Sequence, residues 1–359
     1  MCALLLVAAA CEGDTTPGPG PTASPTAAAV PSGPAGGEKV GIVLAPPTEP
    51  LAAIANPAVR DVAERLHELV AADLARVRVL EPPSEPFRGD QMALLADEGV
   101  GLVCTLGAEG GDEVTALAPQ VPTTRFCLLD GQLRRPPANA VSVGWHIDQG
   151  AFIAGAAAAL AVPEAAVAVV TGIRSPAADR VRSGFEAGAR HVRPDVVVLG
   201  IDAAPEGDAG QGEDRSTARQ RTPEDRSAVR ERTASLLAGD SPVGAVLALG
   251  GEATVRGTAE ATAGYPAVVL GWGVDVGALL DEHGLDAEVL GSVVKRYDLA
   301  LPLALGLAGR PGPPVTVLGL QEDAFAFVPG ESDRYAAIAG GLRQVVGDLR
   351  EGRVGPPPP

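Results

Sequence analysis

Lys295 is the residue whose type and position most suggest chemistry. It ends a short apolar run that begins at Leu290, and an amphipathic segment, Tyr297–Leu307, follows it. We therefore predict a strand ending at Lys295 and a helix after it. In open α/β sheets the carboxyl ends of the strands face the ligand crevice, so the ammonium group is expected to point at a bound molecule. The only other lysine is Lys39, all remaining basic side chains being arginine, which hints that a compact charge is needed at 295. An ordinary lysine at the end of a surface strand is the alternative.

Residue patterns of known catalytic sites are missing from the sequence. Its four histidines lie far apart and none has a metal-ligand spacing such as His-Glu-x-x-His. No Gly-x-Ser-x-Gly elbow occurs, and the glycine-rich stretch at 107–111 lacks the Lys-Ser/Thr of a phosphate-binding loop. We therefore predict no enzymatic activity, no metal and no cofactor.

Composition bounds the class of protein. The 359 residues are enough for two domains with proper cores, and 46% of them are hydrophobic. A formal net charge of −17 without a basic stretch argues against nucleic acid as a partner. Aromatic residues make up only 3% of the chain, which limits the stacking surfaces available to a flat ligand.

Two cysteines, Cys104 and Cys127, each lie within an apolar segment that is expected to be a strand. Buried free thiols are the interpretation that we favour, since neighbouring strands can approach without their Cβ vectors converging. A disulfide between them is the alternative if the protein is exported.

The N-terminal residues resemble an export signal. An apolar run at 1–10, too short to span a bilayer, ends in small residues before Cys11, as in the lipobox of bacterial lipoproteins, although it lacks a positive n-region and has Ala8 where Leu is usual. We therefore predict a signal peptide at 1–11 with lipidation of Cys11. An ordinary signal peptide with a chance cysteine is the alternative. Residues 12–37 are nearly all Pro, Gly, Ala, Ser and Thr, which predicts a disordered tether to the membrane.

Apolar runs and helical patterns alternate along the rest of the chain. Besides the strand at 295, the expected strands are Val40–Leu44, Val77–Leu80, Gly101–Leu106, Phe126–Asp130, Ala140–Trp145, Ala165–Thr171, Asp195–Leu199, Ala245–Leu249 and Ala267–Leu270. The expected helices are Asn56–Ala72, Met92–Glu98, Glu109–Leu117, Gln149–Leu160, Asp179–His191, Glu224–Leu237 and Ala253–Thr262. Repeated βα units with continuous apolar strands indicate parallel sheets covered on both faces.

This number of βα units is too large for one sheet. We therefore predict an α/β fold of two doubly wound lobes joined by a hinge. The expected first lobe comprises 38–146 and 273–296, and the second comprises 147–272 and 297–354. The polar, Gly-rich stretch 203–221 is interpreted as a flexible insertion, and 355–359 as a disordered tail.

Several blocks, in order along the chain, resemble the basic membrane protein (BMP) family of ABC-transporter substrate-binding lipoproteins, whose characterised members include purine-nucleoside receptors. The blocks are Gly101–Ala108, Phe126–Gly131, Asp148–Leu160, Gly184–Ala189 and Gly291–Lys295. The resemblance implies a type I periplasmic-binding-protein fold, a small-molecule ligand such as a purine nucleoside, an ABC permease and ATPase as partners, and a location outside the cytoplasm on a lipid anchor.

The resemblance also implies site residues. Asp130 and Lys295 match an acid and a lysine that hold a sugar-like group, and opposed charges of this kind form directional hydrogen bonds to hydroxyls. Asp130 would otherwise be a turn residue before Gly131. Asp275 matches one of two acids that accept from ribose hydroxyls, and its alternative is a helix N-cap.

Further candidates surround these residues. Trp272 would be a stacking platform, assisted by Tyr297 or Trp145, or else would pack in the hinge. The remaining predicted ligand contacts are Asn56, Gly107, Gly250 and Gly251, where the glycines allow close backbone approach.

The departures from the family pattern fall in one place. Ala55 and Ala108 stand where the family has the two phenylalanines that sandwich a base. Because stacking on an aromatic ring stabilises a bound base by about 1–3 kcal/mol, the receptor architecture is expected to carry over better than the nucleoside specificity.

Three functions follow. The first is a membrane-tethered solute-binding lipoprotein that closes two lobes over a small polar ligand and delivers it to an ABC permease. The second is a sensory module of the same fold without transport. The third is an exported nucleoside hydrolase, for which the sequence shows no acid–base pair.

Overall fold

The computed structural model describes residues 38–47, 49–66, 74–204, 225–273, 275–308 and 314–356. Four predicted features lie wholly or mostly outside this part of the chain: the signal peptide with Cys11, the tether 12–37, the insertion at 203–221 beyond Ala204, and the last three residues of the tail. In the described residues no helix is long and apolar enough to cross a membrane.

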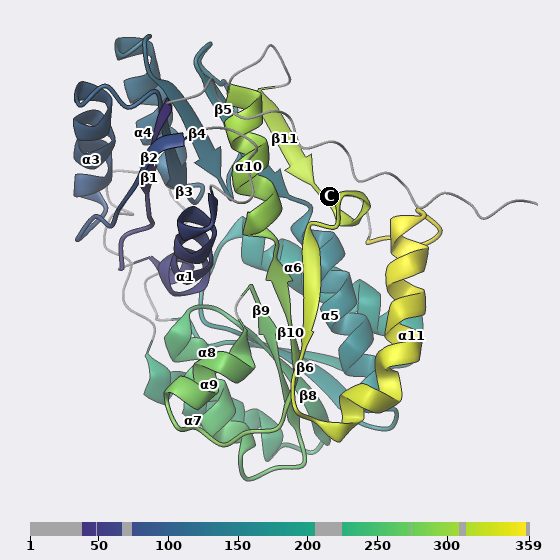
Figure 1. Cartoon of the computed structure of the whole chain (residues 1–359). Coiled ribbons are helices and arrows are strands. Elements are labelled where there is room, and N and C mark those ends of the chain that lie inside the picture. Colours follow the sequence, from purple (N-terminus) through teal and green to yellow (C-terminus); the bar gives the residue numbers. More distant parts are fainter. Residues whose placement is uncertain are drawn as a thin grey trace, which may run out of the picture. The chain divides into compact units, whose positions relative to one another are not determined.

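Two six-stranded sheets form the body of the described chain (Figure 1). The first sheet is parallel throughout, in the order β11-β5-β4-β3-β1-β2. Its strands are β1 (Glu38–Val43), β2 (Leu74–Leu80), β3 (Leu102–Leu106), β4 (Arg125–Leu129), β5 (Ala140–Trp145) and β11 (Val315–Leu318).

The second sheet has the order β12-β10-β9-β8-β6-β7, and only β12 runs antiparallel to its neighbour. Its strands are β6 (Ala166–Thr171), β7 (Val198–Asp202), β8 (Val243–Leu249), β9 (Val268–Trp272), β10 (Val289–Lys295) and β12 (Phe325–Pro329). Two doubly wound sheets are what the alternating pattern predicted.

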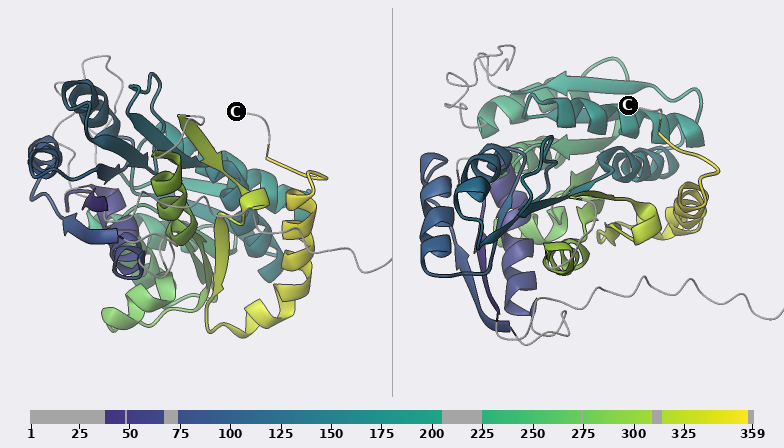
Figure 2. Two further views of the ribbon diagram at one scale, coloured as in Figure 1. Left: turned by 45° about the horizontal axis from the view of Figure 1, so that its top comes forward. Right: turned by 90° about the horizontal axis from the view of Figure 1, so that it is seen from above.

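Helices cover both faces of each sheet (Figures 1 and 2). On the first sheet, α1 (Pro50–Glu64) and α10 (Tyr297–Ala308) lie on one face, and α3 (Pro86–Asp97) and α4 (Gly110–Leu117) on the other. On the second sheet, α5 (Ile147–Ala161), α6 (Pro176–Val192) and α11 (Asp333–Arg350) lie on one face, and α7 (Arg226–Leu237), α8 (Glu252–Thr262) and α9 (Val276–Glu282) on the other. Two short 3-10 turns are Ala118–Gln120 and Leu320–Glu322.

The central strands read as continuous apolar runs because both of their sides are covered. Every residue of β6 and of β8 is buried. Within β6, Val167 and Val169 enter one core cluster while Ala168 and Val170 enter another, as alternating side chains must.

Three helices begin earlier than the apolar pattern predicted. Pro50, Pro86 and Pro176 occupy the first turns of α1, α3 and α6. Proline suits this position because its missing N–H has no partner there and its φ is already helical. Strand starts differ as well, since β7 begins at Val198 rather than at Asp195 and β2 at Leu74 rather than at Val77.

The small residues of α5 and α6 allow their backbones to touch. A Cβ on Gly155 would collide with the Phe185 carbonyl, and a Cβ on Gly188 would collide with the Phe152 carbonyl. The glycines that the BMP-like blocks contain here therefore serve helix packing.

The predicted division into lobes is wrong at its C-terminal half. Residues 273–296 were expected in the first lobe, but β10 pairs with β9 and β12 and so belongs to the second sheet. Conversely, α10 packs on β4 and β5, and β11 joins the first sheet, although both were expected in the second lobe. The described chain therefore crosses between the sheets three times, after β5, after β10 and after β11.

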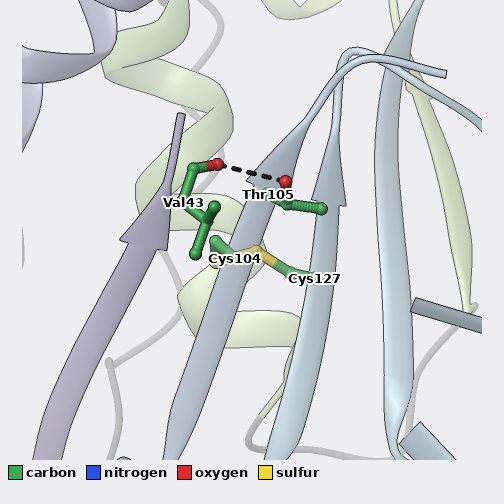
Figure 3. The surroundings of a disulfide bond; sticks show 4 residues. All are labelled: Val43, Cys104, Thr105 and Cys127. Carbon is green, nitrogen blue, oxygen red and sulfur yellow. Dashed lines mark hydrogen bonds between the residues drawn. A yellow bond between two sulfur atoms is a disulfide. The ribbon is translucent and has the colours of Figure 1, made fainter. Parts of the chain in front are cut away.

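Cys104 and Cys127 form a disulfide, so the interpretation as free thiols is wrong (Figure 3). The two residues are direct partners on the parallel strands β3 and β4, with Cα atoms 4.4 Å apart. Their side chains point to the same face because they occupy matching positions of the pleat. The sequence alone did not reveal this register.

Removal of this disulfide is expected to lower stability. The cross-link separates residues 23 apart in sequence, and a closed loop of that length stabilises by about 3 kcal/mol in the chain-entropy description. Cys104→Ala/Cys127→Ala is expected to lose about this much free energy of unfolding in a denaturant titration. Reductant, as the control, lowers the stability of the native chain and leaves the variant unchanged. Free thiols at both positions in an oxidised sample would contradict the assignment.

Candidate functional site

Most of the predicted site residues lie at the carboxyl ends of parallel strands. Gly107 and Asp130 follow β3 and β4 of the first sheet. In the second sheet, Lys295 ends β10, Trp272 ends β9, and Gly250 and Gly251 follow β8. The parallel arrangement thus gathers these residues along the edge at which open α/β sheets bind ligands.

Lys295 and Asp130 are in direct contact. The Lys295 Nζ lies 2.7 Å from each of the two carboxylate oxygens of Asp130. Each side chain is only 10% exposed. Since the two residues come from different sheets, the contact is an ion pair that joins the second sheet to the first.

Two aromatic residues complete the surroundings of this pair. The Tyr297 hydroxyl donates a hydrogen bond of 2.8 Å to Oδ2 of Asp130. Trp145 lies with its ring centroid 5.5 Å from the Lys295 Nζ and packs edge-on against Tyr297 at 5.0 Å between centroids. The four residues form one cluster, which we call the cross-sheet cluster.

Burial and the neighbouring Asp130 carboxylate raise the pKa of the Tyr297 hydroxyl well above its ordinary value. Ionising this phenol would place a second negative charge beside the carboxylate in a buried environment. Tyr297 therefore remains a hydrogen-bond donor throughout the physiological pH range.

Backbone geometry directs Asp130 into the cluster. Its φ is 58°, in the left-handed region, which aspartate tolerates better than most residues. Its amide donates a hydrogen bond of 2.9 Å to the Val143 carbonyl of the neighbouring strand β5. The chain bends at Asp130 and Gly131, and this bend places the carboxylate against Lys295.

The cluster lies where the chain crosses between the sheets. Trp145 and His146 form the first crossing, and Arg296 begins the second. The Ala324 carbonyl, in the third crossing, accepts hydrogen bonds from the Trp145 indole at 3.3 Å and from the Arg296 amide at 2.9 Å. These bonds tie all three crossings together beside the ion pair.

Asn56 holds the loop that follows β1. Its side-chain oxygen accepts from the Ala45 amide at 3.1 Å, and its nitrogen donates to the Ala45 carbonyl at 2.8 Å and to Glu81 at 3.2 Å. The side chain is buried and its hydrogen-bonding groups are used within the protein. These hydrogen bonds go to Ala45 and Glu81 and not to the cross-sheet cluster, so its role at a ligand remains a prediction.

Glu49 provides the second anchor of the same loop. Its carboxylate pairs with the guanidinium of Arg88, a side chain that is 0% exposed. Burial raises the pKa of Glu49 to about 7, although the positive charge of Arg88 opposes the shift. Burial likewise raises the pKa of the nearby Glu113 carboxyl.

Trp272 and Asp275 have structural contacts of their own. Trp272 is buried and packs against Phe325, with 6.3 Å between ring centroids and its ring close to Gly150. Its predicted alternative, packing at the hinge, is therefore what the structure shows. Asp275 caps α9, since its carboxylate accepts from the Ala278 amide at 3.4 Å.

The three predicted glycines are buried at strand ends. Gly107 has a φ of 85°, which favours glycine, and donates its amide to the Leu129 carbonyl at 2.8 Å. Gly250 and Gly251 connect β8 to α8, and Gly251 is the N-cap residue of that helix. Their contact with a ligand is untested and remains a prediction.

Three residues of functional interest were missed or given another role. Tyr297 was considered only as a stacking surface, although its position two residues after Lys295 could have indicated a shared partner. Glu49 and Arg88 carried no motif, because their pairing joins segments 39 residues apart.

Among the described residues, no group of three or more His, Cys, Asp or Glu side chains could hold a metal ion.

Comparison with known proteins points to one family. Residues 85–215 match the family model of Bmp, described as "ABC transporter substrate-binding protein PnrA-like". Over these residues the chain is similar to the Bmp family. Basic membrane protein A of Borreliella burgdorferi is 28% identical over 106 residues, which are 29% of this chain and 31% of that protein. The match therefore spans about a third of the curated relative, and Lys295 lies outside the Bmp segment.

Solved structures agree on the fold over most of the chain. An ABC-transporter solute-binding protein from Conexibacter woesei superposes with a TM-score of 0.64 and 19% identity, covering 88% of this chain and 97% of that one. A solute-binding protein from Aeropyrum pernix gives a TM-score of 0.63 and 16% identity, covering 89% and 94%. The chain thus has the two-lobed α/β fold of these proteins, as predicted.

The ion pair is expected to be energetically coupled. Lys295→Met leaves the Asp130 carboxylate buried without its counter-charge, which is expected to cost about 3 kcal/mol of unfolding free energy. In Asp130→Asn/Lys295→Met both charges are gone, so the double variant is expected to lose about 2 kcal/mol less than the sum of the single variants. Urea titration of the four proteins measures this coupling, and additive losses would contradict a direct pair.

Glu49 is expected to make stability fall with rising pH. Its pKa of about 7 in the folded protein lies above the ordinary value of 4.5. The stabilising contribution is therefore complete below pH 4.5 and is lost as the pH rises through 7, by about 1.4 kcal/mol per pH unit. Subtracting the profile of Glu49→Gln from that of the native chain between pH 5 and 8 cancels all other groups. Parallel profiles would show that Glu49 has no raised pKa.

Proposed function

We propose that this chain is an extracytoplasmic substrate-binding lipoprotein of an ABC importer. It would capture a small polar ligand at the carboxyl edges of its two sheets and deliver it to the permease and ATPase subunits. The Bmp segment and the fold support this proposal. The disulfide supports it as well, because such bonds persist in oxidising compartments outside the cytoplasm.

The observation that carries the proposal is the Lys295–Asp130 pair. It places a carboxylate and an ammonium group from two different sheets within 2.7 Å of each other, at the strand ends and beside all three crossings. A ligand that binds there contacts both sheets at once. Binding energy can then favour one relative arrangement of the lobes, which is what a permease must distinguish.

Binding rather than catalysis suits these groups. Asp130 accepts from the Lys295 ammonium group and from the Tyr297 hydroxyl, and Lys295 donates to the Asp130 carboxylate. Each side chain is therefore fixed as a hydrogen-bonding partner. Hydroxyl groups, such as those on the sugar of a nucleoside, accept from the ammonium and donate to the carboxylate. Lipidation of Cys11 and the Pro/Gly-rich tether would keep the receptor near its permease.

The proposal is tested by ligand-induced stabilisation of the full chain. With a panel of sugars, polyols and nucleosides, at least one compound at a hundredfold excess over its Kd is expected to stabilise the protein by about 2.7 kcal/mol. Lys295→Ala is expected to weaken binding of that compound tenfold or more by calorimetry. Arg296→Ala is the matched control, since the Arg296 guanidinium pairs with Asp298. Native affinity in Lys295→Ala would remove the pair from the site.

A further inference from the structure

The chain has six Phe, three Tyr and two Trp residues, and all of them fall within the described part of the structure. Each aromatic ring can therefore be placed. This matters because recognition of a flat base generally uses an aromatic face on which the base stacks.

Most of the rings are committed to packing. Phe126, Phe152 and Phe185 are fully or almost fully buried in the core. Phe327 and Tyr335 stack on each other at 5.6 Å with an interplanar angle of 10°.

The four rings nearest the strand ends are buried as well. Trp145 and Tyr297 pack on each other, and the Lys295 ammonium lies over the Trp145 ring. Trp272 and Phe325 also pack on each other, with 6.3 Å between ring centroids and an interplanar angle of 33°. A ligand at the cross-sheet cluster therefore meets no free aromatic face among these rings.

The two exposed rings lie elsewhere. Tyr265 is exposed and lies just after the C-terminal end of α8. Gly251, at the strand-end edge where the ligand is proposed to bind, is the N-cap of that helix, and the two ends of the helix are roughly 16 Å apart by helix rise. Phe87 is 50% exposed on α3, which packs on β1 and β3 on the face of the first sheet opposite α10, the helix whose Tyr297 contacts Asp130.

The hydrogen bonds within the cluster leave few donors and acceptors for a ligand. An ammonium group has three donors, and Lys295 uses two of them on Asp130. A carboxylate has about four acceptor positions, and Asp130 uses three on Lys295 and Tyr297. By the contacts of the described residues, one ammonium donor and one carboxylate acceptor of the pair remain without a hydrogen-bond partner, and the ammonium lies over the Trp145 ring.

A hydroxyl group, which both donates and accepts, matches that remaining pair. The cluster also carries one positive and one negative charge, so a charged ligand would meet a like charge at close range whatever its sign. We infer that the ligand of this site is a neutral, non-aromatic, polyhydroxylated small molecule, such as a sugar or cyclic polyol. This inference rests on the proposed function and narrows its ligand class.

The experiment compares ribose with nucleosides, which add a base to it, and with other neutral and charged small molecules. Calorimetry of the full chain with D-ribose, inosine and uridine, together with D-glucose, myo-inositol, amino acids and dicarboxylic acids, measures each affinity. We expect a sugar or polyol to bind best and a nucleoside to gain less than threefold over ribose. A nucleoside that binds tenfold or more tighter than every sugar, or a charged ligand that binds best, overturns the inference while the receptor function stands. If no compound of the panel binds, both fail.

Ala108→Phe provides the matched variant. Ala108 is exposed, and a Cβ built on Gly131 would lie 3.2 Å from the Ala108 Cα, so a ring at 108 would stand beside Asp130. We expect this substitution to raise the affinity for inosine relative to ribose about tenfold. If circular dichroism shows that the variant is folded and the ratio of the two affinities is unchanged, the missing aromatic ring is not what limits recognition of the base.

Phe87→Ala tests the rival platform. Because α3 lies on the face of the first sheet opposite α10 and Tyr297, the substitution is expected to leave all affinities unchanged. A loss of nucleoside binding in Phe87→Ala, with ribose binding retained, would overturn the inference by identifying a base platform on α3.

Discussion

A buried ion pair between two sheets is the constraint on which the site depends. The charges of Lys295 and Asp130 are largely withdrawn from water, and such groups are tolerated only when each has a partner in good geometry. Each of the two charges finds its partner on the other sheet. The arrangement at the strand ends, the left-handed turn at Asp130 and the hydroxyl of Tyr297 all serve to satisfy that pair.

The apolar surroundings make the same junction selective. One core cluster continues from β1 and β3 through Trp145, Ile147 and Tyr297 into the helices of the second sheet. Because this packing uses the aromatic rings at the strand ends, they are not available to a ligand. What remains for recognition is hydrogen bonding between a carboxylate, an ammonium group and hydroxyls.

Particular residues show how far prediction from sequence reached. Lys295 was identified by its type and its position at a strand end, and Asp130 by the family resemblance, and the structure brings them into contact. Lys295 was nevertheless assigned to the wrong lobe, because an apolar strand carries no mark of the sheet that it joins. Cys104 and Cys127 were interpreted as free thiols for a similar reason, since only the register of β3 against β4 aligns their side chains.

The sequence by itself determined the alternation of strands and helices, the doubly wound class and the chemical types present at the strand ends, because these follow from local apolar periodicity and composition. Tertiary structure alone decided which strands share a sheet, that Glu49 meets Arg88, and that Trp145, Tyr297 and Trp272 are used in packing. Such contacts join residues distant in the chain, and their energies depend on burial and register that no local pattern encodes.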